Sequence, residues 1–317
     1  MRAGADALSL LAAPLNVQVI TSLSEEPKSL MDLRRAAGSP PQTTMRGHLK
    51  QLTQIGVLER RRQNNFPGNV DYELGKPGRE LLEVAAVLRR WLERCPEGPL
   101  PLGSVAAKSS IKALVEGWSS TIVRALATRA LTLTELNRLI VGINYPSLER
   151  RLGAMRLAGQ IEARPGRHRG TPYTVTRWLR EAMAPLAAAA HWEREHLAAA
   201  ATAVAPIDAE AAFLLTVPTL RLPSDQDGIC RLTVEIRAGG EHRLAGVVAV
   251  VEEGRVVSCA SRLKGPADGW VSGSAAAWLR AVVEGEEAPL EIGGDSDLSR
   301  SFLDLLHGDL LRVRQSR

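Results

Sequence analysis

Cysteine is scarce in this sequence. The chain holds only Cys95, Cys230 and Cys259, which lie far apart, with no CxxC pair and no cluster of histidines nearby. A zinc site needs closely spaced ligands, and a disulfide framework needs paired cysteines. The sequence therefore predicts no metal and no disulfide, and we expect isolated reduced thiols.

Long apolar runs are also missing. No run reaches the roughly 20 residues that a membrane-spanning helix needs. The segment from Ala7 to Leu15 is shorter, and Leu8, Leu11, Leu15 and Val19 repeat at helical spacing without an obvious cleavage site for a signal peptide. We expect a core helix there, in a cytoplasmic, nucleoid-associated protein without a membrane partner.

A catalytic set is not evident either. Asp268, Asp295, His242 and His307 are scattered, and no nucleophile, oriented base or glycine-rich phosphate loop accompanies them. We therefore expect a protein that is not an enzyme and that carries no cofactor.

Charge is present but unevenly distributed. Residues 206–317 hold 12 Lys and Arg against 17 Asp and Glu, a net charge of −5. Residues 1–205 hold 28 against 18, a net charge of +10. The positive part is where a polyanion such as double-stranded DNA would bind.

The pattern from Gly142 to Leu152 predicts a helix that begins after Asn144. Asn144 can cap the helix, and Pro146 lies where a first-turn proline is tolerated. The helical spacing buries Leu148, Leu152 and Met155 and turns four polar side chains outward, namely Tyr145, Ser147, Arg150 and Arg151. A shorter helix over 133–140 precedes it, with a tight turn around Val141 and Gly142. Two short helices joined in this way are typical of a helix-turn-helix whose second helix enters a DNA groove.

Two β-prone runs, 161–164 and 173–175, follow on either side of a basic tip, which predicts a hairpin. Its candidate DNA contacts are Arg164, Arg167, His168 and Arg169. A helix-turn-helix followed by a basic hairpin is a winged helix. The order of landmarks over residues 107–196 resembles the HxlR family of bacterial winged-helix transcription regulators; these landmarks are Trp118, Glu135-Leu136, Gly142-Ile143-Asn144, Arg151-Leu152, Pro172-Tyr173 and Trp192. The resemblance implies DNA binding by dimers joined through their first and last helices.

Residues 1–95 repeat this unit at low identity. An offset of 103 residues places Leu152 on Leu49, Leu148 on Met45 and Met155 on Leu52, so the core positions stay apolar. After the hairpin an offset of 101 aligns Tyr173 with Tyr72 and Trp192 with Trp91. We expect the length change at the hairpin tip, where insertions cost least.

The first copy predicts its own recognition helix, beginning near Pro40-Pro41 and capped by Ser39. Met45, Leu49 and Leu52 would face the core, which leaves Gln42, Thr43, Arg46 and Lys50 outward. Gln can bind adenine and Arg can bind guanine in the major groove. The hairpin begins with Arg60, Arg61 and Arg62, which we expect to contact phosphates. The alternative is that such a basic run is only a solvated face.

Composition and periodicity change after Pro206. An alanine-rich helix is expected over 186–205, ended by Pro206, and alternating runs over 231–237, 243–251 and 255–260 predict strands, the last two joined by a turn at 252–254. Helices are expected over 274–284 and 298–311. Strands followed by helices indicate an α+β layer with a mostly antiparallel sheet. With Asp268-Gly269-Trp270, Trp278 and the run 290–295 in this order, the segment looks like the sterol-carrier-protein fold.

That resemblance implies an apolar cavity for a hydrophobic small-molecule effector. The residues that we expect to line it are Val248, Val250, Trp270, Trp278, Val282 and Leu306. The alternative is that the same side chains fill a solid core.

The sequence thus predicts two mainly α winged-helix domains and an α+β domain, over residues 1–95, 105–200 and 206–317, with a linker at 96–104. We expect a transcription regulator that binds duplex DNA as a homodimer or as an intramolecular pseudo-dimer, and a C-terminal domain that senses a ligand. One copy that has lost DNA contact and serves dimerisation stays an alternative. So does a hydrophobic-ligand carrier or scaffold whose winged helices bind proteins.

Overall fold

The computed structural model describes residues 2–62, 70–117, 119–164, 170–197, 202–238 and 241–311. The chain divides into two compact units. The first comprises 3–115 and 188–202, and the second comprises Arg2, 116–187 and 203–317. The first unit therefore combines the predicted N-terminal domain with a helix of the predicted second domain and with the later part of helix α11.

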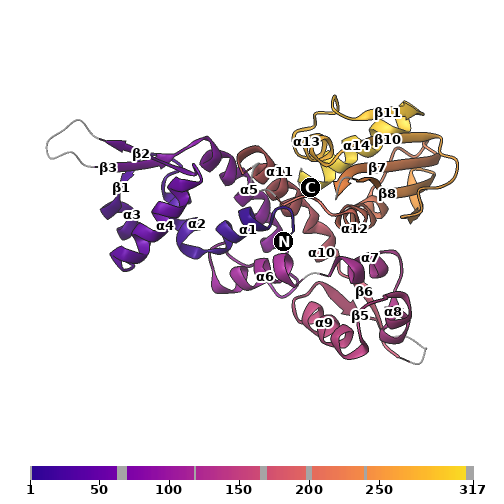
Figure 1. Cartoon of the computed structure of the whole chain (residues 1–317), viewed down its shortest axis with the longest axis horizontal. Helices are drawn as coiled ribbons and strands as arrows, with labels where there is room; N and C mark the ends of the chain where they lie inside the picture. Colours follow the sequence, from indigo (N-terminus) through magenta and orange to yellow (C-terminus); the bar gives the residue numbers. More distant parts are fainter. Residues whose placement is uncertain are drawn as a thin grey trace. The chain divides into compact units, whose positions relative to one another are not determined.

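The first unit is built from helices around one small sheet (Figure 1). Its strands pair antiparallel in the order β1-β3-β2. Its elements are α1 (Ala5–Ala12), α2 (Pro14–Ser22), β1 (Lys28–Ser29), α3 (Leu30–Ala36), α4 (Gln42–Gln54), β2 (Leu58–Arg62), β3 (Val70–Leu74), α5 (Lys76–Glu93), α6 (Val105–Glu116) and the later part of α11 (Met183–His196). Leu8, Leu33, Leu49 and Leu88 are fully buried in its core.

A buried carboxylate holds the start of α1 in this unit. Glu193 of α11 accepts hydrogen bonds from the backbone N–H groups of Gly4 and Asp6, both at 2.7 Å, and of Ala7 at 2.9 Å. The first N–H groups of a helix have no partner within the helix, so Glu193 supplies what a capping residue would. Burial raises the pKa of the Glu193 carboxyl, and the three hydrogen bonds act in the opposite direction.

The second unit begins with a segment whose elements follow the same order as 14–74. They are α7 (Ser120–Thr128), β4 (Leu131–Thr132), α8 (Leu133–Leu139), α9 (Tyr145–Leu157), β5 (Ile161–Ala163) and β6 (Pro172–Val175), followed by α10 (Arg177–Glu181) and the start of α11. The strand order β4-β6-β5 matches β1-β3-β2. Both α4 and α9 have 13 residues, and three buried side chains occupy the same positions in each.

The rest of this unit is a five-stranded sheet covered by helices. Its strand order is β11-β10-β7-β8-β9, and only β7 and β10 are parallel. The elements are α12 (Pro206–Thr216), the 3-10 turn η1 (Val217–Thr219), β7 (Gly228–Ala238), β8 (Glu241–Glu252), β9 (Arg255–Ala260), β10 (Gly269–Ser274), α13 (Ala275–Glu284), β11 (Glu291–Gly294) and α14 (Ser296–Leu311). The expected α+β segment with mostly antiparallel strands is confirmed.

Local signals explain several boundaries in this sheet. Glu253 and Gly254 both have positive φ, as a tight hairpin turn between β8 and β9 requires. Ser274 caps α13 by accepting a hydrogen bond from the N–H of Ala277, and Gly285 ends the helix in the left-handed conformation. Trp278 is buried, stacks edge-on against Phe213 and donates to the carbonyl of Thr233 at 2.7 Å. Helices α12 and α13 therefore pack together on one face of the sheet.

Two predicted helix ends were wrong. The expected alanine-rich helix over 186–205 ends earlier, because α11 closes at His196 and residues 202–205 are not helical. Pro206 starts a helix here, since its fixed φ and missing N–H suit the first turn of α12. Ser39 does not cap α4. It has φ 60° and its N–H donates to the carbonyl of Arg34 at 2.8 Å, which closes α3.

Two arginines join the segment 120–187 to the sheet domain within the second unit. Arg124 of α7 forms a 2.8 Å ion pair with Glu210 of α12 and donates to Ser261 at 3.0 Å. Arg180 of α10 donates to the carbonyls of Leu215 at 2.8 Å and Ala127 at 3.1 Å. Its positive charge lies at the carboxyl ends of α12 and α7, where a cation stabilises both helices. Burial lowers the pKa of Arg180.

Candidate nucleic-acid interface

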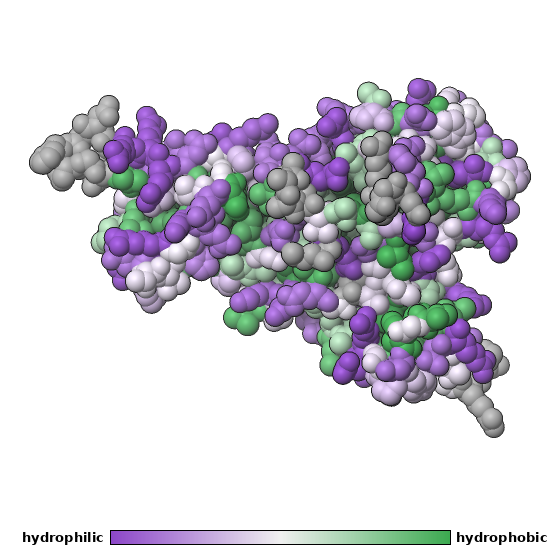
Figure 2. Space-filling view, in the orientation of Figure 1, coloured by the Kyte–Doolittle hydropathy of each residue, from purple (hydrophilic) through white to green (hydrophobic). Residues whose placement is uncertain are grey.

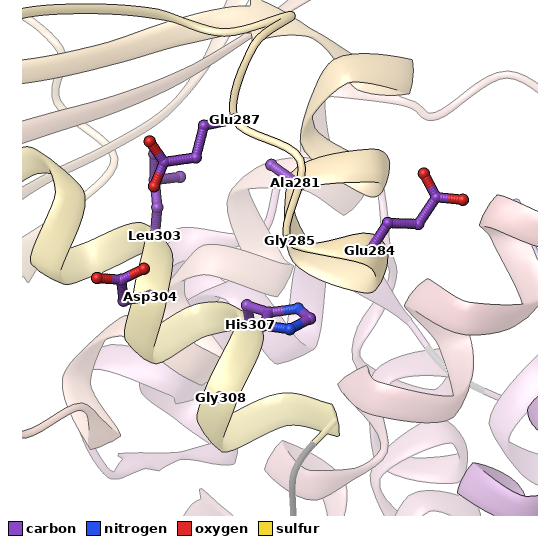
Figure 3. Close-up of a pocket in the computed structure, with 8 residues that line it drawn as sticks. All are labelled: Ala281, Glu284, Gly285, Glu287, Leu303, Asp304, His307 and Gly308. Carbon is purple, nitrogen blue, oxygen red and sulfur yellow. The ribbon is translucent and has the colours of Figure 1, made fainter.

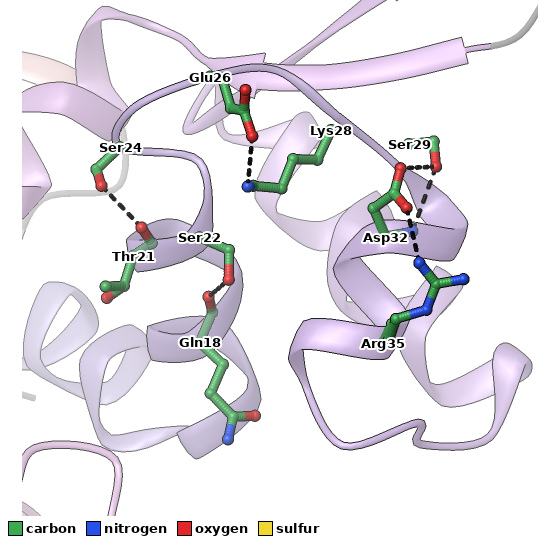
Figure 4. A network of polar contacts seen from close by, with 9 residues as sticks. All are labelled: Gln18, Thr21, Ser22, Ser24, Glu26, Lys28, Ser29, Asp32 and Arg35. Atoms are coloured by element: carbon green, nitrogen blue, oxygen red, sulfur yellow. Dashed lines mark hydrogen bonds and ion pairs between the residues drawn. The ribbon is translucent and has the colours of Figure 1, made fainter.

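Helices α3 and α4 form a helix-turn-helix in the first unit, and a local network fixes the start of α3 (Figure 4). The Ser29 hydroxyl accepts a hydrogen bond from the N–H of Asp32 and donates to its carboxylate at 2.6 Å. The turn after α3 uses Gly38 and Ser39, both with positive φ. The next helix, α4, begins at Gln42 without a side-chain cap.

The four predicted contacts on α4 lie on its exposed side. Gln42, Thr43, Arg46 and Lys50 are exposed, whereas Met45, Leu49 and Leu52 are fully buried. Sequence periodicity missed one anchor: the Nδ1 of His48 lies 2.7 Å from the Oδ1 of Asn16 on α2. Because this oxygen only accepts, Nδ1 donates. The anchor helps to set how far α4 turns its polar side outward.

The hairpin of β2 and β3 carries the three predicted arginines, all of them exposed. Alternation along the strand places Arg60 and Arg62 on one side and Arg61 on the other. Arg60 stacks on the Tyr72 ring, with its guanidinium carbon 5.6 Å from the ring centroid, and donates to the Tyr72 hydroxyl at 3.2 Å. Arg60 is therefore oriented by its neighbour strand.

In the segment 120–175, α9 begins as predicted. The side chain of Asn144 accepts a hydrogen bond from the N–H of Ser147 at 2.9 Å, and Pro146 lies in the first turn. Tyr145, Arg150 and Arg151 are exposed and Ser147 is half-buried. Thr132 and Glu135 form a reciprocal cap at the start of α8.

The hairpin of β5 and β6 is described only in part. Arg164 is exposed and lies 3.8 Å from Glu162, a distance at which an exposed ion pair contributes little. The other predicted hairpin contacts, Arg167, His168 and Arg169, lie outside the described residues, as does Trp118.

The turn between α8 and α9 is more apolar than its counterpart before α4. Leu139 and Val141 are 54% and 96% exposed, and hydrophobic residues gather over α8 in the space-filling view (Figure 2). The residues in the same places before α4 are Ala36 and Gly38. The two exposed surfaces therefore differ in chemistry although their helices have the same length.

The six predicted ligand contacts are divided between the two faces of the large sheet. Val248, Val250 and Trp270 point away from the helices, because they alternate with the buried residues Val247, Ala249 and Val271. Trp278 and Leu306 are buried on the helix-covered face, and Val282 on α13 is half-buried. The structure does not bring these six side chains together around one space.

A pocket of 450 Å³ lies between α13 and α14 (Figure 3). It is lined by Ala281, Glu284, Gly285, Glu287, Leu303, Asp304, His307 and Gly308. The Nδ1 of His307 donates to the carbonyl of Val282 at 2.8 Å. None of the six predicted ligand contacts is in the lining, and three of the eight lining residues are acidic.

The cysteine thiols, possible metal ligands and possible membrane-spanning helices remain to be described. Burial raises the pKa of the Cys230 and Cys259 thiols to about 12, so neither is a thiolate near neutral pH. Within the described ranges, no group of three or more His, Cys, Asp or Glu side chains could hold a metal ion. Of the helices that the structure describes, none is long and apolar enough to cross a membrane.

Comparison with known proteins identifies one part of the chain. No curated protein matches the sequence. Residues 11–98, which run from the end of α1 through α5, match the model of the HxlR-like helix-turn-helix family. That match contains α3, α4 and the arginine-bearing hairpin. The N-terminal part of this chain is therefore similar to an HxlR-like helix-turn-helix, which supports a DNA-binding transcription regulator.

Proposed function

We propose that this protein is a transcription regulator that binds duplex DNA through two winged helix-turn-helix segments of one chain. The observation that carries the proposal is the family match over residues 11–98 together with the exposed polar side of α4. In our proposal α4 lies in the major groove, where Gln42 and Arg46 contact bases. Lys50 and the hairpin residues Arg60, Arg61 and Arg62 contact phosphates, which fixes register and raises affinity.

The second segment is proposed as a duplicate of the first. Its support is that α8 and α9 lie 103 residues after α3 and α4, with equal lengths and equivalent buried positions. In this proposal α9 contacts a neighbouring half-site through Tyr145, Ser147, Arg150 and Arg151. The hairpin residues Arg164, Arg167, His168 and Arg169 would approach the backbone.

We further propose that the chain contains its own dimer-like interface. The later part of α11, the last helix of the second segment, packs in the first unit against α1 and α5. Besides the Glu193 bonds, the Trp192 indole donates to the carbonyl of Pro77 at 2.8 Å, and His196 lies 2.5 Å from the carboxylate of Glu80. Contacts between first and last helices are what the family's dimers use, so one chain would form a pseudo-dimer.

The C-terminal domain is proposed to regulate DNA binding by responding to a hydrophobic molecule. Its support is the bonding of Arg124 and Arg180, which ties α12 to the second helix-turn-helix segment. Such a ligand would have to enter the core near Trp278 and Leu306, on the helix-covered face. It can shift DNA affinity only by binding two arrangements of the domain unequally.

Salt dependence of DNA binding tests the main proposal without knowledge of the operator. The logarithm of the binding constant for a mixed-sequence duplex should fall steeply against the logarithm of salt concentration, with a slope of about −0.9 per phosphate contact. Replacing Arg60, Arg61 and Arg62 by Ala should make the slope shallower by about 2 to 3. Replacing the exposed cations Arg255, Arg262 and Lys264 of the C-terminal domain is the charge-matched control. Equal slopes for both triple variants, or binding insensitive to salt, would favour a carrier or scaffold.

A further inference from the structure

Equivalent positions of α4 and α9 carry opposite charges. Arg46 and Glu149 are each the fifth residue of a 13-residue helix, and each follows a fully buried side chain, Met45 and Leu148. Both are exposed. At the position where α4 exposes a guanidinium group, α9 therefore exposes a carboxylate.

Glu149 is not neutralised by its own helix. Side chains three and four residues apart face each other on a helix, and in α9 these are Pro146, Tyr145, Leu152 and Gly153. None is a cation. Arg150 and Arg151 are adjacent in sequence, but their side chains leave the helix in other directions. Among the residues that the structure describes, the Glu149 side chain makes no ion pair or hydrogen bond.

Two other helical glutamates of this chain form ion pairs within their own helices. Glu181 lies 2.8 Å from Arg177, and Glu284 lies 3.8 Å from Arg280, both at a spacing of four residues. A helix stabilised only by surface pairing would place a Lys or Arg at position 153 or 145 to serve Glu149. Instead the helix has Gly153, around which a Cβ would meet no atom within 4 Å. The carboxylate and the open surface beside it are left available to an external group.

The chemistry of the major groove restricts what an unpaired carboxylate can bind there. Guanine presents two acceptors and thymine one, and phosphates are anionic, so all three disfavour a carboxylate. Cytosine presents the N4 amino group, from which Glu can accept a hydrogen bond, whereas the amino group of adenine lies beside the acceptor N7. Arg46 has the opposite preference, since its guanidinium pairs with the two acceptors of guanine.

Resting on the proposed function, we propose that Glu149 reads a cytosine and makes the two half-sites of the operator chemically different. Lys50 of α4 has Gly153 as its counterpart, so α9 also lacks the phosphate contact proposed for Lys50. The segment with α9 contributes sequence preference. An operator with unlike halves is bound in one orientation only, which a symmetric dimer cannot achieve.

The test is selection of bound duplexes from random DNA by the full chain and by two variants. Glu149→Arg places in α9 the residue that α4 has at the same position. Glu291→Arg, at an exposed position of β11, is the matched charge reversal. We expect the wild-type protein to select a two-part motif with a cytosine in one half. Glu149→Arg should change the preferred base at that position from cytosine to guanine. The ratio of the affinities for the guanine duplex and the cytosine duplex should rise about tenfold or more, whereas Glu291→Arg should leave this ratio unchanged.

The possible results distinguish a failure of the inference about Glu149 from a failure of the proposed DNA binding. If Glu149→Arg binds all duplexes more tightly with an unchanged motif, Glu149 only repels phosphates and the inference fails while DNA binding stands. A one-part motif in the wild-type protein also overturns the inference, since α9 would then read nothing. Selection of no motif together with salt-insensitive binding would instead sink the proposed function.

Discussion

Gly47 provides a substitution whose effects on stability and on DNA binding should have opposite signs. It is the sixth residue of α4 and is exposed, and a Cβ built on it would meet no atom within 4 Å. Neither packing nor backbone conformation requires glycine there, because its φ is in the ordinary helical range. The protein therefore tolerates an unfavourable helix residue on the surface that we assign to DNA.

The stability gain follows from helix propensity. Glycine inside a helix is less favourable than alanine by about 0.5–1 kcal/mol, mainly because it restricts the unfolded chain less. With open space around the new methyl group, no strain offsets the gain. We expect Gly47→Ala to raise the free energy of unfolding by this amount and the melting temperature by about 1–4 °C.

The effect on DNA binding should be a loss. If α4 lies in the groove, Gly47 is a point of close approach, adjacent in sequence to Arg46. A methyl group there would hold the helix away from the bases and lengthen the Arg46 hydrogen bonds. Because a good paired contact to a base is worth about 1–3 kcal/mol, we expect about tenfold weaker binding to the selected duplex.

Two assays on the same preparations decide the matter. Thermal unfolding measures stability, and fluorescence anisotropy with the selected duplex measures affinity at fixed salt. The control is Gly308→Ala in α14, whose Cβ also meets nothing within 4 Å and which should stabilise the chain without affecting DNA binding. Unchanged or tighter binding by Gly47→Ala would refute the placement of this side of α4 against DNA.

Two further substitutions test the buried polar contacts. Glu193→Ala should lower the free energy of unfolding by about 2 kcal/mol, since three N–H groups of α1 lose their acceptor; Glu83→Ala on the exposed side of α5 is the control, and equal effects would contradict the role. Because folding raises the pKa of Glu193, the difference in free energy of unfolding between the wild-type protein and Glu193→Ala should depend on pH. It should fall as the pH rises from the pKa of an ordinary carboxyl group to the pKa of Glu193 in the folded protein, and stay level above that. Urea unfolding from pH 4 to pH 8 measures this, and a difference that grows with pH would contradict it. Arg180→Ala should cost about 2–3 kcal/mol against almost nothing for Arg177→Ala, whose arginine side chain is 90% exposed, and similar losses in urea unfolding would dismiss Arg180 as the link between α7 and α12.

Local signals made much of the fold predictable. Asn144 and Pro146 mark the start of α9, and the 3.6-residue period separates Leu148, Leu152 and Met155 from the exposed arginines. The turn at 252–254 and the end of α13 at Gly285 were predictable for the same reason. Ser39 misled because a serine before two prolines resembles a cap, whereas the left-handed backbone after Gly38 belongs to the end of α3.

Long-range contacts were beyond such signals. Glu193 lies in a charged run that suggests solvent exposure, yet it is 1% exposed because its partners are the first residues of the chain. Arg180 likewise donates hydrogen bonds to backbone carbonyls of α7 and α12. Every residue has a backbone carbonyl, so the sequence does not indicate which of them an arginine will bind. Val248 and Val250 were placed with Trp278 because Val247–Val251 is apolar at every position, so alternation could not assign the two faces.

The most direct test of two DNA-binding segments in one chain is a hydroxyl-radical footprint on the selected duplex. It should be recorded where sedimentation shows one chain bound per duplex. We expect two protected regions whose centres lie one helical turn, about 34–36 Å, apart. A single protected region per chain, with a second appearing only when two chains bind, would contradict it.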